Sequence, residues 1–239
     1  MKGANFPALG FWAALGAAPL LSGCDQGKQS QSGNAPEAAK TATPSSIPMG
    51  GAKSVTRFFI ASKGLGKGAD LGGLAGADAQ CQALAEAQGA GDHNWRAYLS
   101  TQATATTPAV NARDRIGGGP WYNADGDLIA QNLAQLHGAM SKLDKETGVT
   151  ESAEEVSADQ HEILTGSRPD GTAFPAGADR TCGNWTSSST GSAQVGYFDR
   201  TGEGENPNSW NSARGTGGCS EEALKRSSGA GLFYCFATN

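Results

Sequence analysis

The sequence of 239 residues predicts a disulfide-braced α+β domain. Within residues 78–101, Cys81, Leu84 and Ala85 stand at spacings i, i+3 and i+4, which place them on one face of an amphipathic helix. Residues 95–100 then alternate between two sets of side chains, which is the period of a half-buried strand. A hydrophobic share of 38% with 35 glycines suits a small core with many tight turns rather than a helical bundle.

In the predicted helix and strand, Gly89 and Gly91 are expected to end the helix, because glycine adopts the left-handed conformation common at helix C-termini. Trp95, Ala97 and Leu99 form one side of the strand pattern. The other side is formed by Arg96, Tyr98 and Ser100.

Residues 1–24 predict a lipoprotein signal peptide. One lysine precedes an apolar run of secretory length, which is too short and too interrupted by glycine and proline to predict a membrane span. The run ends in Leu21-Ser22-Gly23-Cys24, which resembles a bacterial lipobox, so Cys24 is expected to carry the lipid. The alternative is an ordinary signal peptide in which Cys24 is incidental. The lipobox predicts an exported protein whose acyl chains anchor it to the membrane of the bacterial cell envelope, on its periplasmic or surface side.

Residues 25–53 predict a disordered tether, because Ser, Gln, Ala, Pro and Gly dominate and large apolar side chains are nearly absent. Residues 54–239 are expected to form the folded domain.

Four cysteines remain once Cys24 is set aside, and they are Cys81, Cys182, Cys219 and Cys235. An even number in an exported chain predicts two disulfides, but spacing alone leaves all three pairings open. Because the other three cysteines lie in the last quarter of the chain, the helix that carries Cys81 is expected to be tied to the far end of the sequence.

The remaining elements follow from local patterns. Asp125-Gly126 between apolar pairs predicts a hairpin over residues 120–130, and Pro169-Asp170-Gly171 predicts a turn. Trp95, Trp121 and Trp185 are expected in the core. We expect strands at 55–61, 182–186 and 231–237, a glycine-rich loop at 63–76 and a solvated excursion at 133–159. A long segment rich in glycine, serine and asparagine runs over 187–218.

Several functions are disfavoured by the sequence. A formal net charge of −5 without a run of basic residues argues against nucleic-acid binding. A metal centre built on histidine or cysteine is not indicated, because there is no CxxC and the three histidines lack ligand spacing. No Gly-x-Ser-x-Gly, HExxH or free cysteine supports an enzyme, although two carboxylates in 199–205 could approach one another as in glycosidases.

The order of several motifs resembles endostatin, a domain of the C-type lectin-like fold. The resemblance rests on residues 76–81 and 95–100, the Asp125-Gly126 hairpin, the 166–171 segment, Cys182 with Trp185, residues 191–193, and the last two cysteines. It covers roughly residues 55–239, and similar bacterial domains are often called lectins. The resemblance implies nested disulfides, Cys81–Cys235 and Cys182–Cys219. The outer loop closure would be worth about 5 kcal/mol, so full reduction should lower thermal stability.

Two endostatin activities are not carried over. Its zinc site uses N-terminal histidines, which the start of this domain lacks, and its heparin binding uses surface arginines, which the negative net charge here disfavours.

The resemblance also directs attention to the loop between the second and third cysteines, where sugar-binding C-type lectins hold calcium. Calcium is possible at Glu205, Asn208 and Asn211, with motifs that are similar but imperfect, since Asn206 intervenes before Pro207 and Ser212 replaces an acid. Three interpretations stay open: calcium-dependent sugar binding, calcium-free binding of a glycan or protein, and a purely structural loop packed by Trp210. The candidate ligand-binding residues are Asp199, Glu203, Glu205, Asn206, Asn208, Trp210 and Asn211.

The predicted function is therefore recognition at the cell envelope, with glycan as the leading ligand and no catalysis. The alternative is an envelope protein-interaction or structural module without a sugar site. Replacement of Trp210 by alanine separates them: lost binding with intact stability favours a functional loop, and unfolding favours a structural one.

Overall fold

The computed structural model describes residues 52–239. The predicted signal peptide, Cys24 and residues 25–51 of the predicted tether lie outside the described residues. None of the described helices has the length and apolar character needed to cross a membrane.

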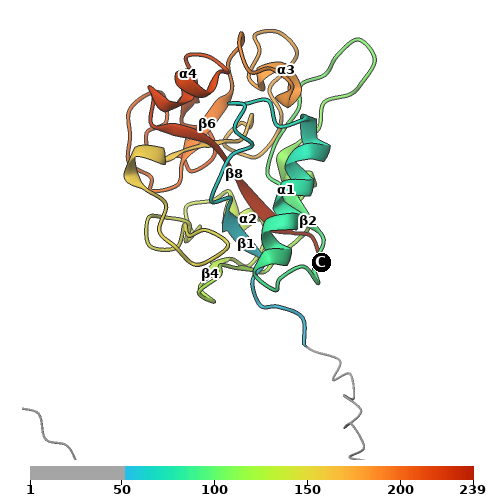
Figure 1. The fold of residues 1–239 in the computed structure, drawn as a ribbon, viewed down its shortest axis with the longest axis vertical. Helices are drawn as coiled ribbons and strands as arrows, with labels where there is room; N and C mark the ends of the chain where they lie inside the picture. The colour runs from blue at the N-terminus through green and yellow to red at the C-terminus, as the bar shows by residue number, and fades with distance from the viewer. Residues whose placement is uncertain (1–51) are drawn as a thin grey trace, which may run out of the picture. The chain divides into compact units, whose positions relative to one another are not determined.

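The main sheet is built around the C-terminal strand β8 (Gly229–Ala237), as Figure 1 shows. The end of β8 runs between β1 (Phe58–Ile60) and β2 (Trp95–Ala97), antiparallel to both. Its beginning pairs in parallel with β5 (Glu162–Leu164). The sheet then continues through two antiparallel neighbours, β6 (Gln194–Tyr197) and β7 (Arg214–Gly215). The predicted terminal strand is thus confirmed, two residues longer than expected at its start.

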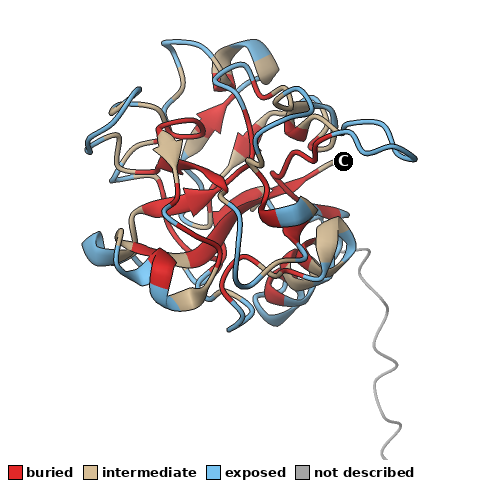
Figure 2. Cartoon of the chain, turned by 90° about the horizontal axis from the view of Figure 1, so that it is seen from above, coloured by how far each residue is buried: buried red, intermediate tan, exposed pale blue. Residues whose placement is uncertain are grey.

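Both faces of β8 are buried, because apolar side chains alternate along it into two clusters. Phe233 and Cys235 join the cluster beneath helix α1 (Gly73–Ala87), whereas Tyr234 and Phe236 join the cluster on the opposite face. Figure 2 shows the buried strands at the centre and exposed loops around them. The mixed α+β class predicted from the sequence is confirmed.

Helix α1 is confirmed, and so is its buried face of Cys81, Leu84 and Ala85. It begins at Gly73, inside the segment predicted as glycine-rich loop, and Gly89 follows its end with φ +74°. The strand after it differs from expectation. Tyr98 and Ser100, predicted on the polar side, are fully buried, because the second apolar cluster and polar groups cover that face.

The predicted hairpin is confirmed as β3 (Trp121–Tyr122) and β4 (Leu128–Ala130). The Asn123 side-chain oxygen accepts hydrogen bonds from the N–H groups of Asp125 and Asp127, which closes the turn. Trp95, Trp121 and Trp185 are core residues as predicted. Short helical elements complete the described chain: α2 (Leu133–Leu136), α4 (Glu221–Lys225), and the 3₁₀ turns Ala112–Asp114 and Ala158–Gln160.

Two local predictions are wrong. The expected strand at 182–186 is the short helix α3 (Cys182–Trp185), capped by the Thr181 hydroxyl. Its residues take left-handed dihedrals there, which a strand pattern of apolar side chains does not reveal. The segment 187–218, which is rich in glycine, serine and asparagine, contains β6 and β7. The excursion at 133–159 is not fully solvated, because Leu143 and Val149 are buried. In addition, the Glu151 carboxylate accepts hydrogen bonds from the N–H and the hydroxyl of Ser62.

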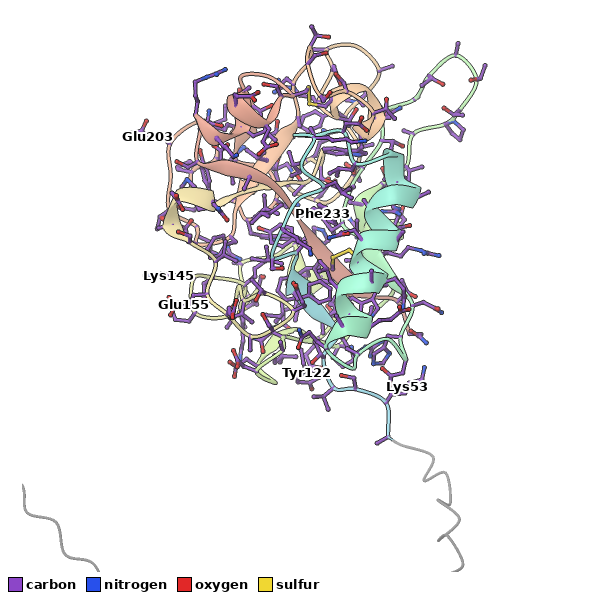
Figure 3. All side chains as sticks on the ribbon, in the orientation of Figure 1. Lys53, Tyr122, Lys145, Glu155, Glu203 and Phe233 are labelled. Carbon is purple, nitrogen blue, oxygen red and sulfur yellow. A yellow bond between two sulfur atoms is a disulfide. The ribbon has the colours of Figure 1, made fainter. Side chains whose placement is uncertain are left out.

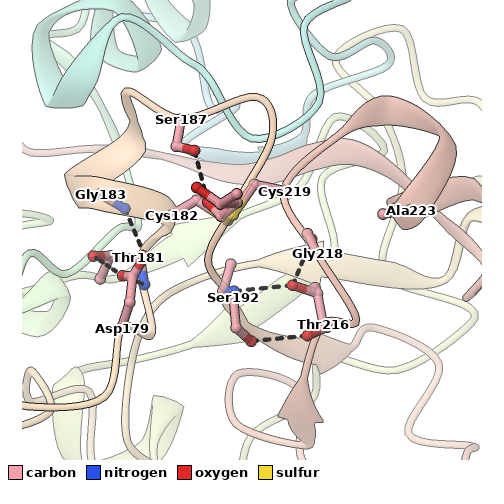
Figure 4. The surroundings of a disulfide bond; sticks show 12 residues. Asp179, Thr181, Cys182, Gly183, Ser187, Ser192, Thr216, Gly218, Cys219 and Ala223 are labelled. Carbon is pink, nitrogen blue, oxygen red and sulfur yellow. Dashed lines mark hydrogen bonds between the residues drawn. A yellow bond between two sulfur atoms is a disulfide. The ribbon is translucent and has the colours of Figure 1, made fainter.

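Both disulfides have the pairing that the resemblance implies. Cys81–Cys235 joins α1 to the central strand β8, with the Cα atoms 5.5 Å apart and a sequence separation of 154. Cys182–Cys219 closes a loop of 37 residues that contains β6 and β7. Around this second bridge, Asp179 accepts from the Gly183 N–H, and Ser192 donates to the Thr216 carbonyl (Figure 4).

Candidate functional site

The candidate ligand residues all fall in residues 198–213, which connect β6 to β7 and are called the β6–β7 loop below. The first part of this loop is open to solvent, with Thr201 through Asn206 exposed. The second part turns inward, and Trp210 through Ala213 are buried. The loop returns very close to β6: a Cβ on Gly196 would lie 1.8 Å from the Trp210 carbonyl oxygen.

Trp210 lies in the core, with 4% of its surface exposed. Its ring centroid is 4.9 Å from that of Tyr98 and 5.2 Å from that of Tyr234, and its indole N–H donates to the Leu136 carbonyl at 3.1 Å. A sugar that stacks on an aromatic residue needs an open ring face. In this structure Trp210 therefore does not offer a binding platform, in contrast to its selection as a ligand residue from the sequence.

Asn211 is also buried, at 1% exposure. Its side-chain amide donates to the Tyr98 hydroxyl at 2.9 Å and to the carbonyls of Arg168 and Pro169 at 3.2 Å, while its side-chain oxygen accepts from Ser209. An ion in solvent does not reach this oxygen.

The structure therefore does not assemble the calcium set of Glu205, Asn208 and Asn211, because the first two are exposed and the third is enclosed. Within residues 52–239, no cluster of three His, Cys, Asp or Glu side chains has metal-binding geometry.

The open half of the loop borders a polar cavity of about 500 Å³, which we call the Arg214 pocket. Strands β5, β6 and β7 supply its floor, the β6–β7 loop forms one wall, and the turn before β8 forms the other. The lining residues are His161, Glu162, Tyr197, Gly202, Glu203, Gly204, Arg214, Ser227 and Ser228.

Arg214 is held by a network on the pocket floor. Its Nη2 group makes an ion pair with Glu162, which is 1% exposed, and its Nε–H donates to the Tyr197 hydroxyl at 2.9 Å. The Ser227 hydroxyl donates to the other Glu162 oxygen at 2.9 Å. Burial alone would lower the pKa of Arg214, but the Glu162 carboxylate and the Tyr197 hydroxyl together outweigh burial and raise this pKa. Arg214 is therefore a fixed, permanently protonated donor.

His161 and Asp199 form a second pair beside this network. The His161 Nδ1 atom lies 3.2 Å from the Asp199 carboxylate, and its ring stacks on Tyr197 with centroids 4.7 Å apart. Asp199 also lines a neighbouring cavity of about 350 Å³ together with Lys145 and Glu155. Because His161 directly precedes Glu162, the first residue of β5, the two pairs lie beside one another at the start of this strand.

The loop wall rests on Tyr197. The Tyr197 hydroxyl donates to the Glu203 carbonyl at 2.8 Å, and a Cβ on Gly202 would lie 2.2 Å from the tyrosine ring. Only glycine fits this approach without displacement. Burial raises the pKa of the Tyr197 hydroxyl, which therefore stays protonated as a donor at neutral pH. The Glu203 side chain projects outward at the edge of the domain, while Phe233 lies in its interior (Figure 3).

Of the seven candidate ligand residues, the structure brings Glu203 to the pocket wall and places Asp199 behind His161. The Asn206 side-chain amide donates to the Ser212 carbonyl and so links the two parts of the loop. Sequence inspection missed Glu162 and Arg214. The signal for Glu162 was a carboxylate within the apolar run of a strand, since such a residue requires a buried partner.

A scan against protein-family models found no match to this chain, and a search of curated proteins found no similar sequence.

Proposed function

We propose that this chain is an exported, lipid-anchored envelope protein whose C-type lectin-like domain of the endostatin type binds a glycan in the Arg214 pocket. The observation that carries the proposal is the preorganised network on the pocket floor, in which Arg214 is fixed by Glu162, Tyr197 and Ser227. The proposal is one of recognition, without a chemical step.

Three features support a sugar as the ligand. The cavity of about 500 Å³ lies within the usual range of small-ligand sites. Its lining is rich in hydroxyl, carboxylate and guanidinium groups, which are the partners that sugar hydroxyls require. Fixed donors also reduce the ordering cost of binding, because the site keeps its geometry before the ligand arrives.

The proposal places recognition away from Trp210 and Asn211 and does not require calcium. It differs in this respect from the calcium-dependent alternative. The lipid anchor and the export of the domain remain predictions from the leader sequence.

The first test is a glycan array with the purified protein in its oxidised form, run once in calcium and once with a chelator. We expect specific hits that persist in the chelator. The variant Arg214→Lys keeps the positive charge opposite Glu162 but loses the planar fork, so it should weaken these hits at least tenfold. Arg226→Lys is the matched control, because Arg226 is exposed and does not line the pocket.

The second candidate is an envelope protein-interaction or structural module. This candidate is favoured by the burial of Trp210 and Asn211, because residues 210–213, the inner half of the β6–β7 loop, belong to the core. A blank array across bacterial and eukaryotic glycans would contradict the glycan proposal. Crosslinking in the intact envelope would then identify a protein partner.

A further inference from the structure

The basic side chains that line the Arg214 pocket each face a carboxylate of the protein. Arg214 pairs with Glu162, and His161 lies against Asp199. Among the lining residues these two are the basic side chains, and the remaining ionisable groups are Tyr197 and the carboxylate of Glu203 at the rim. The pocket therefore presents no unmatched positive charge to a ligand.

Arg214 nevertheless keeps donors for a ligand. Its Nε–H donates to the Tyr197 hydroxyl, and its Nη2 group forms the ion pair with Glu162 and donates to the Ser227 carbonyl. Among the described residues no acceptor takes a hydrogen bond from its Nη1 group. This nitrogen is not buried, since it is absent from the buried polar atoms that have no partner. With one third of the side chain exposed, the two Nη1 N–H groups are available from the pocket.

We propose that the glycan residue bound in the Arg214 pocket is an uncharged sugar and that Glu162 excludes acidic sugars such as uronic acids. This inference rests on the proposed function and specifies its ligand class. Unpaired arginines favour carboxylates, because the guanidinium fork matches a carboxylate. Here Glu162 already occupies that role, so a ligand carboxylate on Nη1 would place two like charges on one guanidinium in a partly desolvated site.

Sugar hydroxyls avoid this penalty. They accept hydrogen bonds from Nη1 without bringing a second negative charge toward Glu162. In this arrangement Glu162 has two effects: it orients Arg214, and it cancels the charge that would otherwise attract an acid.

The test compares matched pairs of methyl glycosides, galactoside with galacturonide and glucoside with glucuronide, by ligand-observed NMR on the oxidised protein. We expect the wild type to bind at least one neutral member about tenfold or more tightly than its acidic partner. The variant Glu162→Gln retains shape and the Ser227 contact but leaves Arg214 unmatched, so it should gain affinity for the acidic member. Glu86→Gln, on the exposed side of α1, is the control for loss of one charge.

The outcomes separate the two proposals. A wild type that prefers the acidic member overturns the exclusion by Glu162 but leaves glycan binding standing. The same holds if Glu162→Gln, shown by circular dichroism to be folded, has unchanged selectivity. A wild type that binds neither these glycosides nor any array glycan overturns both.

Discussion

The two halves of the β6–β7 loop have similar polar compositions but opposite environments. Residues 201–206, which include Glu203, Glu205 and Asn206, lie at the surface, and residues 202–204 line the Arg214 pocket. Residues 210–213 are equally rich in groups that suit a ligand, yet they are enclosed by Tyr98, Leu136 and Tyr234. The difference shows that a Trp-Asn pair in a glycine-rich loop indicates hydrogen-bonding capacity, but not whether its partner is a ligand or the core.

The strongest test of this difference is Trp210→Ala. Removal of a buried tryptophan leaves a cavity among Tyr98, His137 and Tyr234, so we expect a loss of about 3–5 kcal/mol in the free energy of unfolding. Urea denaturation followed by circular dichroism measures it. Trp210→Phe keeps a ring in the core and should lose less than half as much. If Trp210→Ala keeps wild-type stability and loses ligand binding, the inner half of the loop is the site after all.

Asn211→Ala should have the next largest effect, about 2 kcal/mol. It removes the donor to the Tyr98 hydroxyl and leaves the Arg168 and Pro169 carbonyls without that partner inside the protein. The same denaturation experiment applies. Asn208→Ala is the matched control in the exposed half, and it should change stability by less than about 0.5 kcal/mol. Equal losses of unfolding free energy in Asn211→Ala and Asn208→Ala would contradict the assignment of one half of the loop to the core and the other to the surface.

The buried half should also respond to pH through His137, which contacts Trp210 and Tyr98. Burial lowers the pKa of His137 below its ordinary value of 6.5, against the opposing effect of the hydrogen bond that its Nδ1–H donates to the Leu133 carbonyl. The unfolded chain therefore binds a proton more readily. This contribution to stability is complete above pH 6.5 and is lost as the pH falls toward the folded-state pKa.

Urea denaturation between pH 7.5 and pH 5 measures this smaller effect, with the free energy of unfolding expected to fall below about pH 6.5. In His137→Gln the slope over this window should be shallower. Since His93 and His161 remain in that variant, the difference in slope isolates His137. An identical slope in both proteins would contradict the burial argument.

The smallest effect is expected for Glu205→Ala in the exposed half. Glu205 is exposed, and its carboxylate has no hydrogen-bond or ion-pair partner within residues 52–239. Its removal should therefore change the free energy of unfolding by less than about 0.5 kcal/mol. Since the structure does not assemble the calcium set, thermal melting of the wild type should be the same in calcium and in chelator. A chelator-dependent melting temperature that is lost in Glu205→Ala would restore the calcium hypothesis.

The success of local predictions followed from local causes. Three correct predictions depend on side-chain periodicity or turn chemistry within a few residues. They are the face of α1 that carries Cys81, the hairpin at Asp125-Gly126 and the terminal strand. The failures depend on distant contacts. Tyr98 is buried by Asn211, His137 and Trp210, which lie 39 or more residues away in the chain.

Periodicity and the cysteine count were enough to predict the helix that carries Cys81, the terminal strand, the α+β class and the number of disulfides. The disulfide pairing needed the resemblance, and the structure agrees with it. That Trp210 and Asn211 belong to the core, while Glu162 and Arg214 line a pocket, follows only from contacts between distant parts of the chain. Glu162 and Arg214 are brought together by the pairing of β5 with β6 and of β6 with β7. The register of this pairing cannot be predicted from the residues around either position, because it depends on strands that are distant in the sequence.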